Sequence, residues 1–401
     1  ETGLKHMCTA KCHASKEGCD LKVPVWAETE KMRKKRTPPL TDGASPTIPN
    51  YNIEIIVIDE AFMVDTSILS MFIYALRKYA EEHKLKDLPH IVFIGDNAQL
   101  LPVSYGQPIL DFERSGIVPI HHLQQIHRHA DKSVLSTAIN SLRERQLFND
   151  MDETYSIVPV TEKTMKKVIL EWIDSHPETS LNGIVHPDDH RSIGWNTAII
   201  VPTNELLNQI TPIIREHLNP VSVNPPIMIG PFEFKFRIGD KVMQIKNNAK
   251  RDVFNGSCGR VVKFVERKRE VLRANGKIER IPTYTLHVLF NDRDYDVLYE
   301  IDEAKTELNL AYAFTTHKAQ GSEYEHVLII MNRPIPGFIN RNLIYTGASR
   351  GKRSVTIALT SMNIRKGWRD LPAERCTNLV AMIDEKVEFE EEPSSESLIA
   401  V

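Results

Sequence analysis

Two adjacent carboxylates, Asp59 and Glu60, directly follow the aliphatic run Ile53–Ile58, in which Glu54 is the single polar residue. Such a run predicts a strand buried on both faces, and open α/β sheets bind their ligands at the carboxyl ends of strands. In nucleotide hydrolases the first carboxylate at this position holds Mg²⁺ through water, and the second polarises the attacking water. We therefore predict Asp59 as the metal residue and Glu60 as the base. The alternative interpretation is an acidic turn after a core strand.

Gln99 follows the next predicted strand. Apolar residues recur at helical spacing over Ser67–Lys84, and a second buried strand is predicted at His90–Ile94, running into Gly95–Val103. Strand, helix and strand in this order indicate a parallel α/β unit. Gln99 is thus expected on a loop beside the two carboxylates, where its amide can hydrogen-bond a γ-phosphate or the attacking water.

The α/β pattern begins again further along the chain. Strands are predicted at Val118–Leu123, Thr197–Pro202, Val327–Met331 and Ser354–Leu359, and helices at Met165–Ser175, Asn204–His217 with Thr203 as N-cap, Ala311–Ala319 and Arg341–Ser349. Between residues 233 and 301 the pattern changes to short strands joined by turn signals, including Asn255-Gly256 and Asn275-Gly276. This pattern of short strands and turns predicts a small antiparallel barrel inserted into a second α/β domain.

Composition limits the class of protein. The 401 residues are 41% hydrophobic and 26% charged, enough for two or three domains with cores. A net charge of −3 excludes a uniformly basic nucleic-acid coat, although a local basic groove remains compatible with it. We find neither an apolar run that could span a bilayer nor a signal-peptide pattern, and the cysteine count of five is odd. These features predict a cytoplasmic or nuclear protein without membrane contact.

Both ends of the chain have biased composition. Residues 1–50 are predicted to be a partly disordered lead-in, and residues 385–401 an acidic disordered tail. Cys8, Cys12 and Cys19 lie near His6 and His13, but their spacing does not match a paired zinc knuckle. Reduced thiols without a special role are the favoured interpretation, with zinc binding as the alternative.

Six segments, in order, resemble the motifs of superfamily 1 helicases of the RecD/TraA-like, 5′-to-3′ branch, as in the exonuclease V alpha subunit. They are Ile58–Ala61 (Walker B), Gly95–Leu100 (GDxxQL), Gln125–Arg128, Phe236–Gly256 (the SH3-like insertion), Thr315–Glu323 (TxHKxQGxE) and Tyr345–Lys352 (YTAxTRAK). The resemblance covers residues 53–360. The family usually has Gln after the arginine of the third motif, where this chain has His129.

The resemblance implies a fold and a domain order. It implies two RecA-like parallel-sheet domains, the first one incomplete, with an SH3-like β-barrel insertion in the second. The implied bounds are 51–115 for the first domain, 116–232 with 302–384 for the second, and 233–301 for the insertion.

The resemblance also implies roles for individual residues. Catalytic roles fall to Asp59, Glu60, Gln99, Arg128 and Arg350, ATP binding to Gln320, Gly321 and Glu323, and DNA-backbone binding to Thr315, His317 and Lys318. The implied cofactors are ATP and Mg²⁺, with Asp59 as the metal residue, and the implied partner is single-stranded DNA or DNA with a 5′ overhang. Both arginines would reach the γ-phosphate from the second domain, so that hydrolysis drives domain motion.

One family motif is missing. The 401 residues contain no G-x-x-x-x-G-K-[ST] phosphate loop, which the family places ahead of the Walker B strand. The predicted function is an ATP-dependent 5′-to-3′ DNA helicase or translocase, and a chain without the loop is predicted to be inactive alone. The alternatives are a non-catalytic DNA-binding or scaffold module that retains the fold and, less favoured, an RNA helicase of the same superfamily.

Overall fold

The structure is a computed structural model that describes residues 54–85, 88–123, 133–144, 146, 148–176, 196–272, 278–333, 335, 338–360 and 379–380. The chain divides into two compact units, Glu1–Ile56 and Val57–Val401. The features described below belong to the second unit, apart from the first residues of the first strand.

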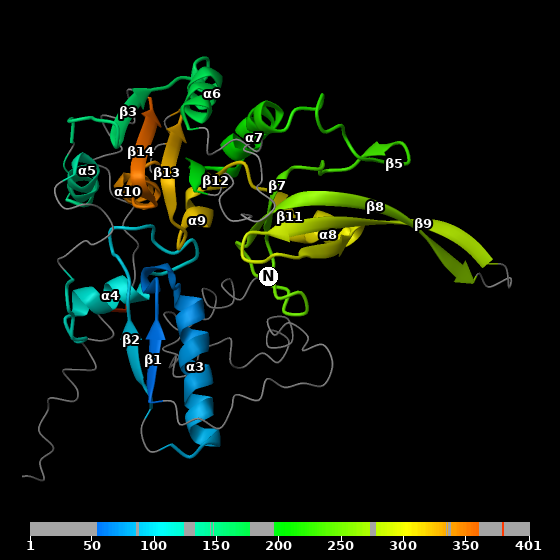
Figure 1. The fold of residues 1–401 in the computed structure, drawn as a ribbon. Coiled ribbons are helices and arrows are strands. Elements are labelled where there is room, and N and C mark those ends of the chain that lie inside the picture. The colour runs from blue at the N-terminus through cyan, green and yellow to red at the C-terminus, as the bar shows by residue number, and fades with distance from the viewer. Residues whose placement is uncertain are drawn as a thin grey trace, which may run out of the picture. The chain divides into compact units, whose positions relative to one another are not determined.

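A strand–helix–strand unit carries the first two motifs. Strand β1 (Ile55–Ile58) leads through the short helix η2 (Ala61–Met63) into helix α3 (Thr66–Glu82), and β2 (His90–Phe93) pairs with β1 in a two-stranded sheet (Figure 1). Asp65 caps α3, its carboxylate accepting a hydrogen bond from the Ile68 amide at 2.8 Å. The prediction that β1 is buried on both faces is wrong, because Ile55 and Val57 are 60% and 57% exposed. Burial of both faces needs neighbours above and below the sheet, which the strand's own residues do not supply.

The described fold contains a five-stranded parallel sheet. Its strand order is β12-β4-β13-β14-β3, and every neighbouring pair is parallel. The strands are β3 (Tyr155–Pro159), β4 (Thr197–Val201), β12 (Phe314–Thr315), β13 (Tyr324–Met331) and β14 (Gly351–Leu359). Four helices flank the sheet (Figure 1): α5 (Val134–Arg143), α6 (Met165–Ser175), α7 (Asn204–Leu218) and α10 (Arg341–Ala348).

The side-chain alternation of β4 divides the core between the two faces of this sheet. Ile200 packs in the cluster that contains α5 and α10, whereas Ile199 and Val201 pack in the cluster that contains α6 and α7. Since successive strand residues point to opposite faces, each pair of helices covers one face. This is the layer order of a doubly covered α/β domain, as predicted for the second domain.

A second, antiparallel sheet follows α7. Its order is β10-β9-β8-β7-β11, with its own apolar core. The elements are β7 (Lys241–Gln244), β8 (Cys258–Leu272), β9 (Ile278–Phe290), β10 (Asp296–Glu300), α8 (Ile301–Glu307) and β11 (Leu308–Leu310), preceded by a small hairpin of β5 (Met228–Ile229) and β6 (Phe232–Glu233). The sheet therefore runs from Lys241 to Leu310, and the bounds 233–301 for the insertion stay a prediction.

Two local predictions differ from the structure, and one helix was not predicted. No strand forms at Val118–Leu123, where Leu123 is 86% exposed. The helix predicted at Ala311–Ala319 is instead β12 followed by the four-residue helix α9 (Thr316–Ala319), and α4 (Pro108–Ser115) was not predicted. A short apolar run becomes a strand only where a neighbouring strand pairs with it, and sequence periodicity does not report that neighbour.

Candidate functional site

The carboxyl ends of β1 and β2 bring the first two motifs together. The Ile94 amide donates to the Ile58 carbonyl at 2.9 Å, and the Ala61 amide donates to the Ile94 carbonyl at 2.8 Å. A Cβ at Gly95 would lie 3.1 Å from the Ala61 nitrogen and 2.8 Å from the Phe62 ring, so this close approach favours glycine. The carboxylate pair and the Gly95–Leu100 loop are thus neighbours, as predicted.

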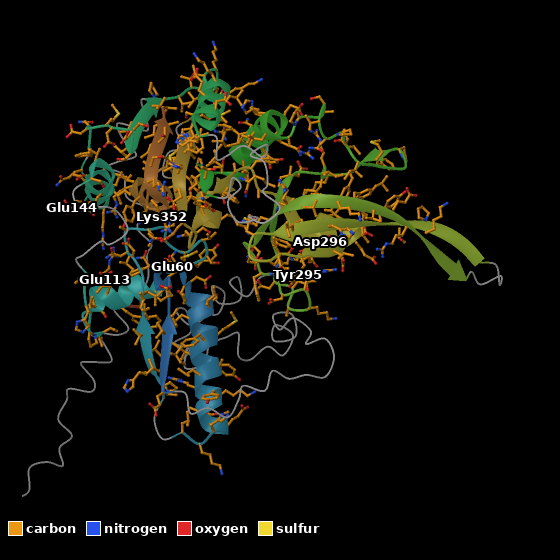
Figure 2. The ribbon with its side chains drawn as sticks, in the orientation of Figure 1. Glu60, Glu113, Glu144, Tyr295, Asp296 and Lys352 are labelled. Atoms are coloured by element: carbon orange, nitrogen blue, oxygen red, sulfur yellow. The ribbon has the colours of Figure 1, made fainter. Side chains whose placement is uncertain are left out.

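Asp59 and Glu60 turn sharply away from the strand. Asp59 is exposed, and its Oδ1 accepts a hydrogen bond from the Glu60 amide at 2.8 Å. Glu60, labelled in Figure 2, has φ 50° and ψ 39°, a left-handed conformation that is uncommon for a residue with a side chain. Backbone strain of this kind clusters at functional sites, and it ends the strand at the carboxylates.

Helix α10 holds the Gly95–Leu100 loop. The Tyr345 hydroxyl donates to Asp96 Oδ2 at 2.6 Å, Asn342 Nδ2 donates to the Gln99 carbonyl at 2.6 Å, and the Leu100 amide donates to Thr346 Oγ1 at 2.9 Å. Burial, with Asp96 as a further cause, raises the pKa of the Tyr345 hydroxyl. These three α10 residues carried no predicted role, although their spacing of three and four residues places them on one helix face.

Arg350 is the residue at which three motifs meet. Its guanidinium is almost fully buried, and it donates to Gln99 Oε1 at 3.2 Å, to the Thr346 carbonyl at 3.2 Å and to the Ser322 carbonyl at 3.5 Å. These acceptors belong to the Gly95–Leu100 loop, to α10 and to the Thr315–Glu323 segment respectively. Gln99 and Arg350, predicted separately as catalytic, are therefore in direct contact.

The predicted nucleotide residues Gln320, Gly321 and Glu323 belong to the segment whose Ser322 carbonyl accepts a hydrogen bond from Arg350. Within the described residues, neither polar atom of the buried Gln320 amide has a hydrogen-bond partner. Gly321 has φ 72°, and Glu323 pairs with Lys352 Nζ at 2.7 Å. Lys352 is labelled in Figure 2. An unsatisfied buried amide is costly unless something completes it, so Gln320 fits a place where a bound group supplies the missing partners.

The three predicted DNA residues open the short helix α9. Thr315 is buried, and its hydroxyl accepts a hydrogen bond from the Lys318 amide at 3.4 Å, so it acts as the helix N-cap. Burial lowers the pKa of His317 from 6.5, which keeps the imidazole neutral at neutral pH. Lys318 is exposed, and its Nζ donates to Asn255 Oδ1 at 3.1 Å.

Several predicted residues lie outside the described residues. These are Arg128 with its neighbour His129, the cysteines Cys8, Cys12 and Cys19, and the histidines His6 and His13. Within the described part of the chain, no group of three or more His, Cys, Asp or Glu side chains is arranged to hold a metal ion. Over the same residues, no helix has the length and apolarity needed to cross a membrane.

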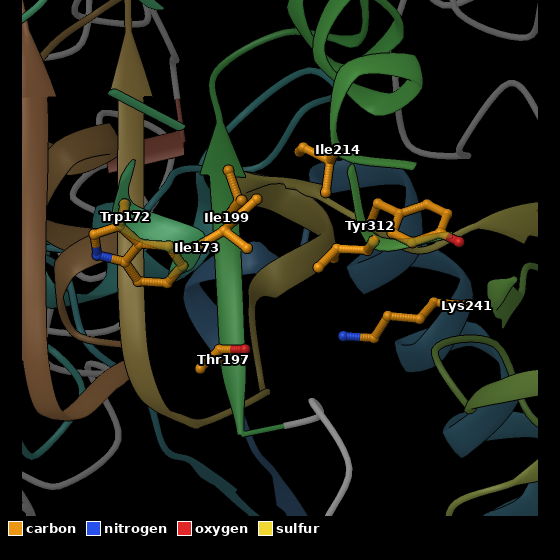
Figure 3. A pocket seen from close by; sticks show the side chains of 8 residues that line it. Trp172, Ile173, Thr197, Ile199, Ile214, Lys241 and Tyr312 are labelled. Carbon is orange, nitrogen blue, oxygen red and sulfur yellow. The ribbon is translucent and has the colours of Figure 1, made fainter. Parts of the chain in front are cut away.

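A small pocket lies away from these residues. It is lined by Trp172, Ile173, Thr197, Ile199, Ile214, Leu218, Lys241 and Tyr312. Figure 3 shows this mostly apolar lining together with the Lys241 side chain. Burial lowers the pKa of Lys241 to about 8. None of the predicted site residues lines this pocket, so we do not assign the chemistry to it.

Family models match three successive parts of the chain. Residues 28–155 match an AAA domain, 207–275 match the ATP-dependent RecD-like DNA helicase SH3 domain, and 310–358 match the UvrD-like helicase C-terminal domain. The predicted resemblance to superfamily 1, RecD-like helicases is confirmed. The SH3 domain match overlaps β7 and β8 of the antiparallel sheet, and the C-terminal match covers β12, β13 and most of β14 of the parallel sheet.

Individual RecD-like relatives are distant. The ATP-dependent RecD2 DNA helicase of Deinococcus radiodurans is 24% identical over 75% of this chain and 35% of its own length. The RecBCD enzyme subunit RecD of Haemophilus influenzae is 23% identical over 76% of this chain and 50% of its own length. The chain thus spans about a third to a half of these relatives. A solved Pif1 helicase from Bacteroides, in complex with ADP-AlF3 and ssDNA, aligns with TM-score 0.44 and 18% identity over 88% of this chain and 81% of that one.

Proposed function

We propose that this chain is part of an ATP-dependent motor that moves 5′-to-3′ along single-stranded DNA. The observation that carries the proposal is the position of Arg350. This side chain is buried where three helicase-like motifs meet, and it donates a hydrogen bond to Gln99. A residue that contacts both a phosphate-sensing glutamine and the Thr315–Glu323 segment can couple a nucleotide to a nucleic acid.

The residues present fit a bound nucleotide. In this proposal Asp59 would hold Mg²⁺ through water, Glu60 would accept the proton of the attacking water, and the Gln320 amide would gain the partners that it lacks among the described residues. Bound Mg²⁺ would neutralise charge on the phosphates. Arg350 would hold the nucleotide through a charge-assisted hydrogen bond, which is stronger than the bond it donates to Gln99. On the predicted roles, Arg128 provides a second guanidinium.

The proposal is tested by ATP hydrolysis of the longest native form of the protein, with and without single-stranded DNA. We expect DNA-stimulated turnover, and we expect Glu60→Gln to abolish turnover while leaving DNA affinity unchanged, because the amide cannot accept the proton. Glu54→Gln, at an exposed carboxylate just ahead of the same strand, is the matched control and should hydrolyse ATP normally. Turnover retained in Glu60→Gln would refute the assignment of Glu60.

The second candidate is a DNA-binding module that keeps the fold without hydrolysis. The observation that favours it is the lack of a phosphate-loop motif within the 401 residues. DNA binding without turnover in the longest native form would support this candidate.

If the longest native form does hydrolyse ATP, the direction of movement is tested with single-stranded DNA that carries a bound ligand at one end. A 5′-to-3′ motor displaces the ligand from the 3′ end only.

A further inference from the structure

Phe254 is an exposed aromatic residue on a loop of the antiparallel sheet. The loop joins β7 to β8, and within it Val253 is completely buried in the core of the sheet whereas Phe254 is 53% exposed. Isolated exposed apolar residues are common on protein surfaces and need no explanation by themselves. Two further features of this loop distinguish Phe254 from such residues.

The first feature is that hydrogen bonds on both sides of Phe254 fix the loop. The Asn255 amide donates to Asn247 Oδ1 at 2.9 Å, the Gly256 amide donates to the Gln244 carbonyl at 2.9 Å, and Asn248 forms an antiparallel bridge with Val253. Gly256 has φ 100°, which lets the chain turn back into β8. The ring of Phe254 is therefore presented to solvent from an ordered backbone, which reduces the entropy lost on binding.

The second feature is the position of the loop beside the predicted DNA residues. Lys318 Nζ donates to Asn255 Oδ1 at 3.1 Å, so the residue after Phe254 touches the Thr315–Glu323 segment directly. The loop is also basic. Lys246 and Lys250 are exposed, Arg251 pairs with Glu303 and Glu307, and Asp252 is the acidic residue within the loop.

We propose that Phe254 is a stacking platform for a base of single-stranded DNA, with Lys246 and Lys250 binding neighbouring phosphates. This inference rests on the proposed function, because it assumes that DNA passes Lys318. An aromatic face beside exposed lysines is an arrangement by which proteins bind single strands without reading sequence. The SH3-like part of the chain would thereby hold the strand that the two RecA-like parts move along.

The test is the affinity of the longest native form for a fluorescent oligothymidine, measured by anisotropy, beside an abasic strand of equal length. We expect Phe254→Ala to weaken binding about 5- to 150-fold, the range given by one base–aromatic stack. Phe254→Trp should retain wild-type affinity, because indole also stacks. Phe232→Ala removes a ring that is 74% exposed on the β5–β6 hairpin and serves as the control, with no expected change.

Two readouts separate stacking from charge and from misfolding. Phe254→Ala should leave the slope of log affinity against log salt unchanged and should bind abasic DNA as the wild type does, whereas Lys250→Ala should reduce that slope by about one. Wild-type affinity in Phe254→Ala, or an equal loss on abasic DNA, would overturn this inference and leave the motor proposal standing. A wild-type protein that does not bind single-stranded DNA would overturn both.

Discussion

Two buried polar networks in this molecule are completed in different ways. Asp240, at the start of the antiparallel sheet, is fully buried and accepts five hydrogen bonds. Its donors are Arg215 Nε and Nη2 at 3.0 and 2.5 Å, the Tyr312 hydroxyl at 2.9 Å, Asn219 Nδ2 at 2.9 Å and the Arg237 amide at 2.7 Å. The carboxylate has an opposite charge beside it and a donor at each available position.

The network around Arg350 joins three motifs of the chain. Its guanidinium donates to Gln99 Oε1 and to the carbonyls of Thr346 and Ser322, and the neighbouring Gln320 amide has no partner among the described residues. A buried amide without partners is costly unless a ligand completes it, so the capacity of this network for a ligand lies at Gln320, beside Arg350. We infer that Asp240 serves stability and Arg350 serves binding.

Arg350→Ala should produce the largest effect. In the longest native form we expect DNA-stimulated ATP hydrolysis to fall ~10³- to 10⁵-fold, the usual contribution of an arginine that contacts the γ-phosphate. Arg350→Lys should also lose most activity, since an ammonium cannot donate in the same fork. Steady-state turnover measures this, with single-stranded DNA affinity and thermal unfolding as checks on folding. Near-normal turnover in either folded variant would remove the distinction between the two networks.

Of the two networks, the one around Asp240 should contribute more to the stability of the fold, and Asp240→Asn tests this. The amide cannot compensate the Arg215 charge, and we expect a loss of about 3–5 kcal/mol in the free energy of unfolding in urea. Glu171→Gln is the control. It removes an exposed ion pair, in which Lys167 Nζ lies 3.6 Å from Glu171 Oε1, and should change stability little. A small effect at Asp240 would mean that the surrounding donors are satisfied without its charge.

Lys241→Met should be stabilising at pH 7, by about 1–3 kcal/mol. Burial lowers the pKa of Lys241 in the folded state from 10.5 to about 8, so below pH 8 the folded protein carries the cost of a buried ammonium. Between about pH 8 and 10.5 the unfolded chain binds more protons, and wild-type stability therefore rises with pH. The advantage of Met should shrink across this window in urea titrations at several pH values. A constant advantage would show that packing, not charge, is responsible.

Much of the fold follows from local patterns. The strand, helix and strand around Asp59 and Gln99, the N-cap Thr203 of α7 and the helix at Arg341–Ala348 were all predicted correctly. Hydrophobic periodicity and capping are properties of neighbouring residues, so sequence reports them directly. The unpaired segment Val118–Leu123 and the exposed face of β1 were not predictable in this way, because pairing and coverage depend on distant partners.

The sequence by itself determined the chemistry available at each position: adjacent carboxylates at a strand end, a glutamine after the next strand, and an arginine after a helix. Only the tertiary structure decided that Gln99 and Arg350, 251 residues apart, share a hydrogen bond, and that Tyr345 and Asn342 hold the loop that carries Gln99. It also placed Lys318 against Asn255 and thereby put Phe254 beside the predicted DNA path. Such contacts join elements that no local pattern relates, since folding alone sets which helix faces which loop.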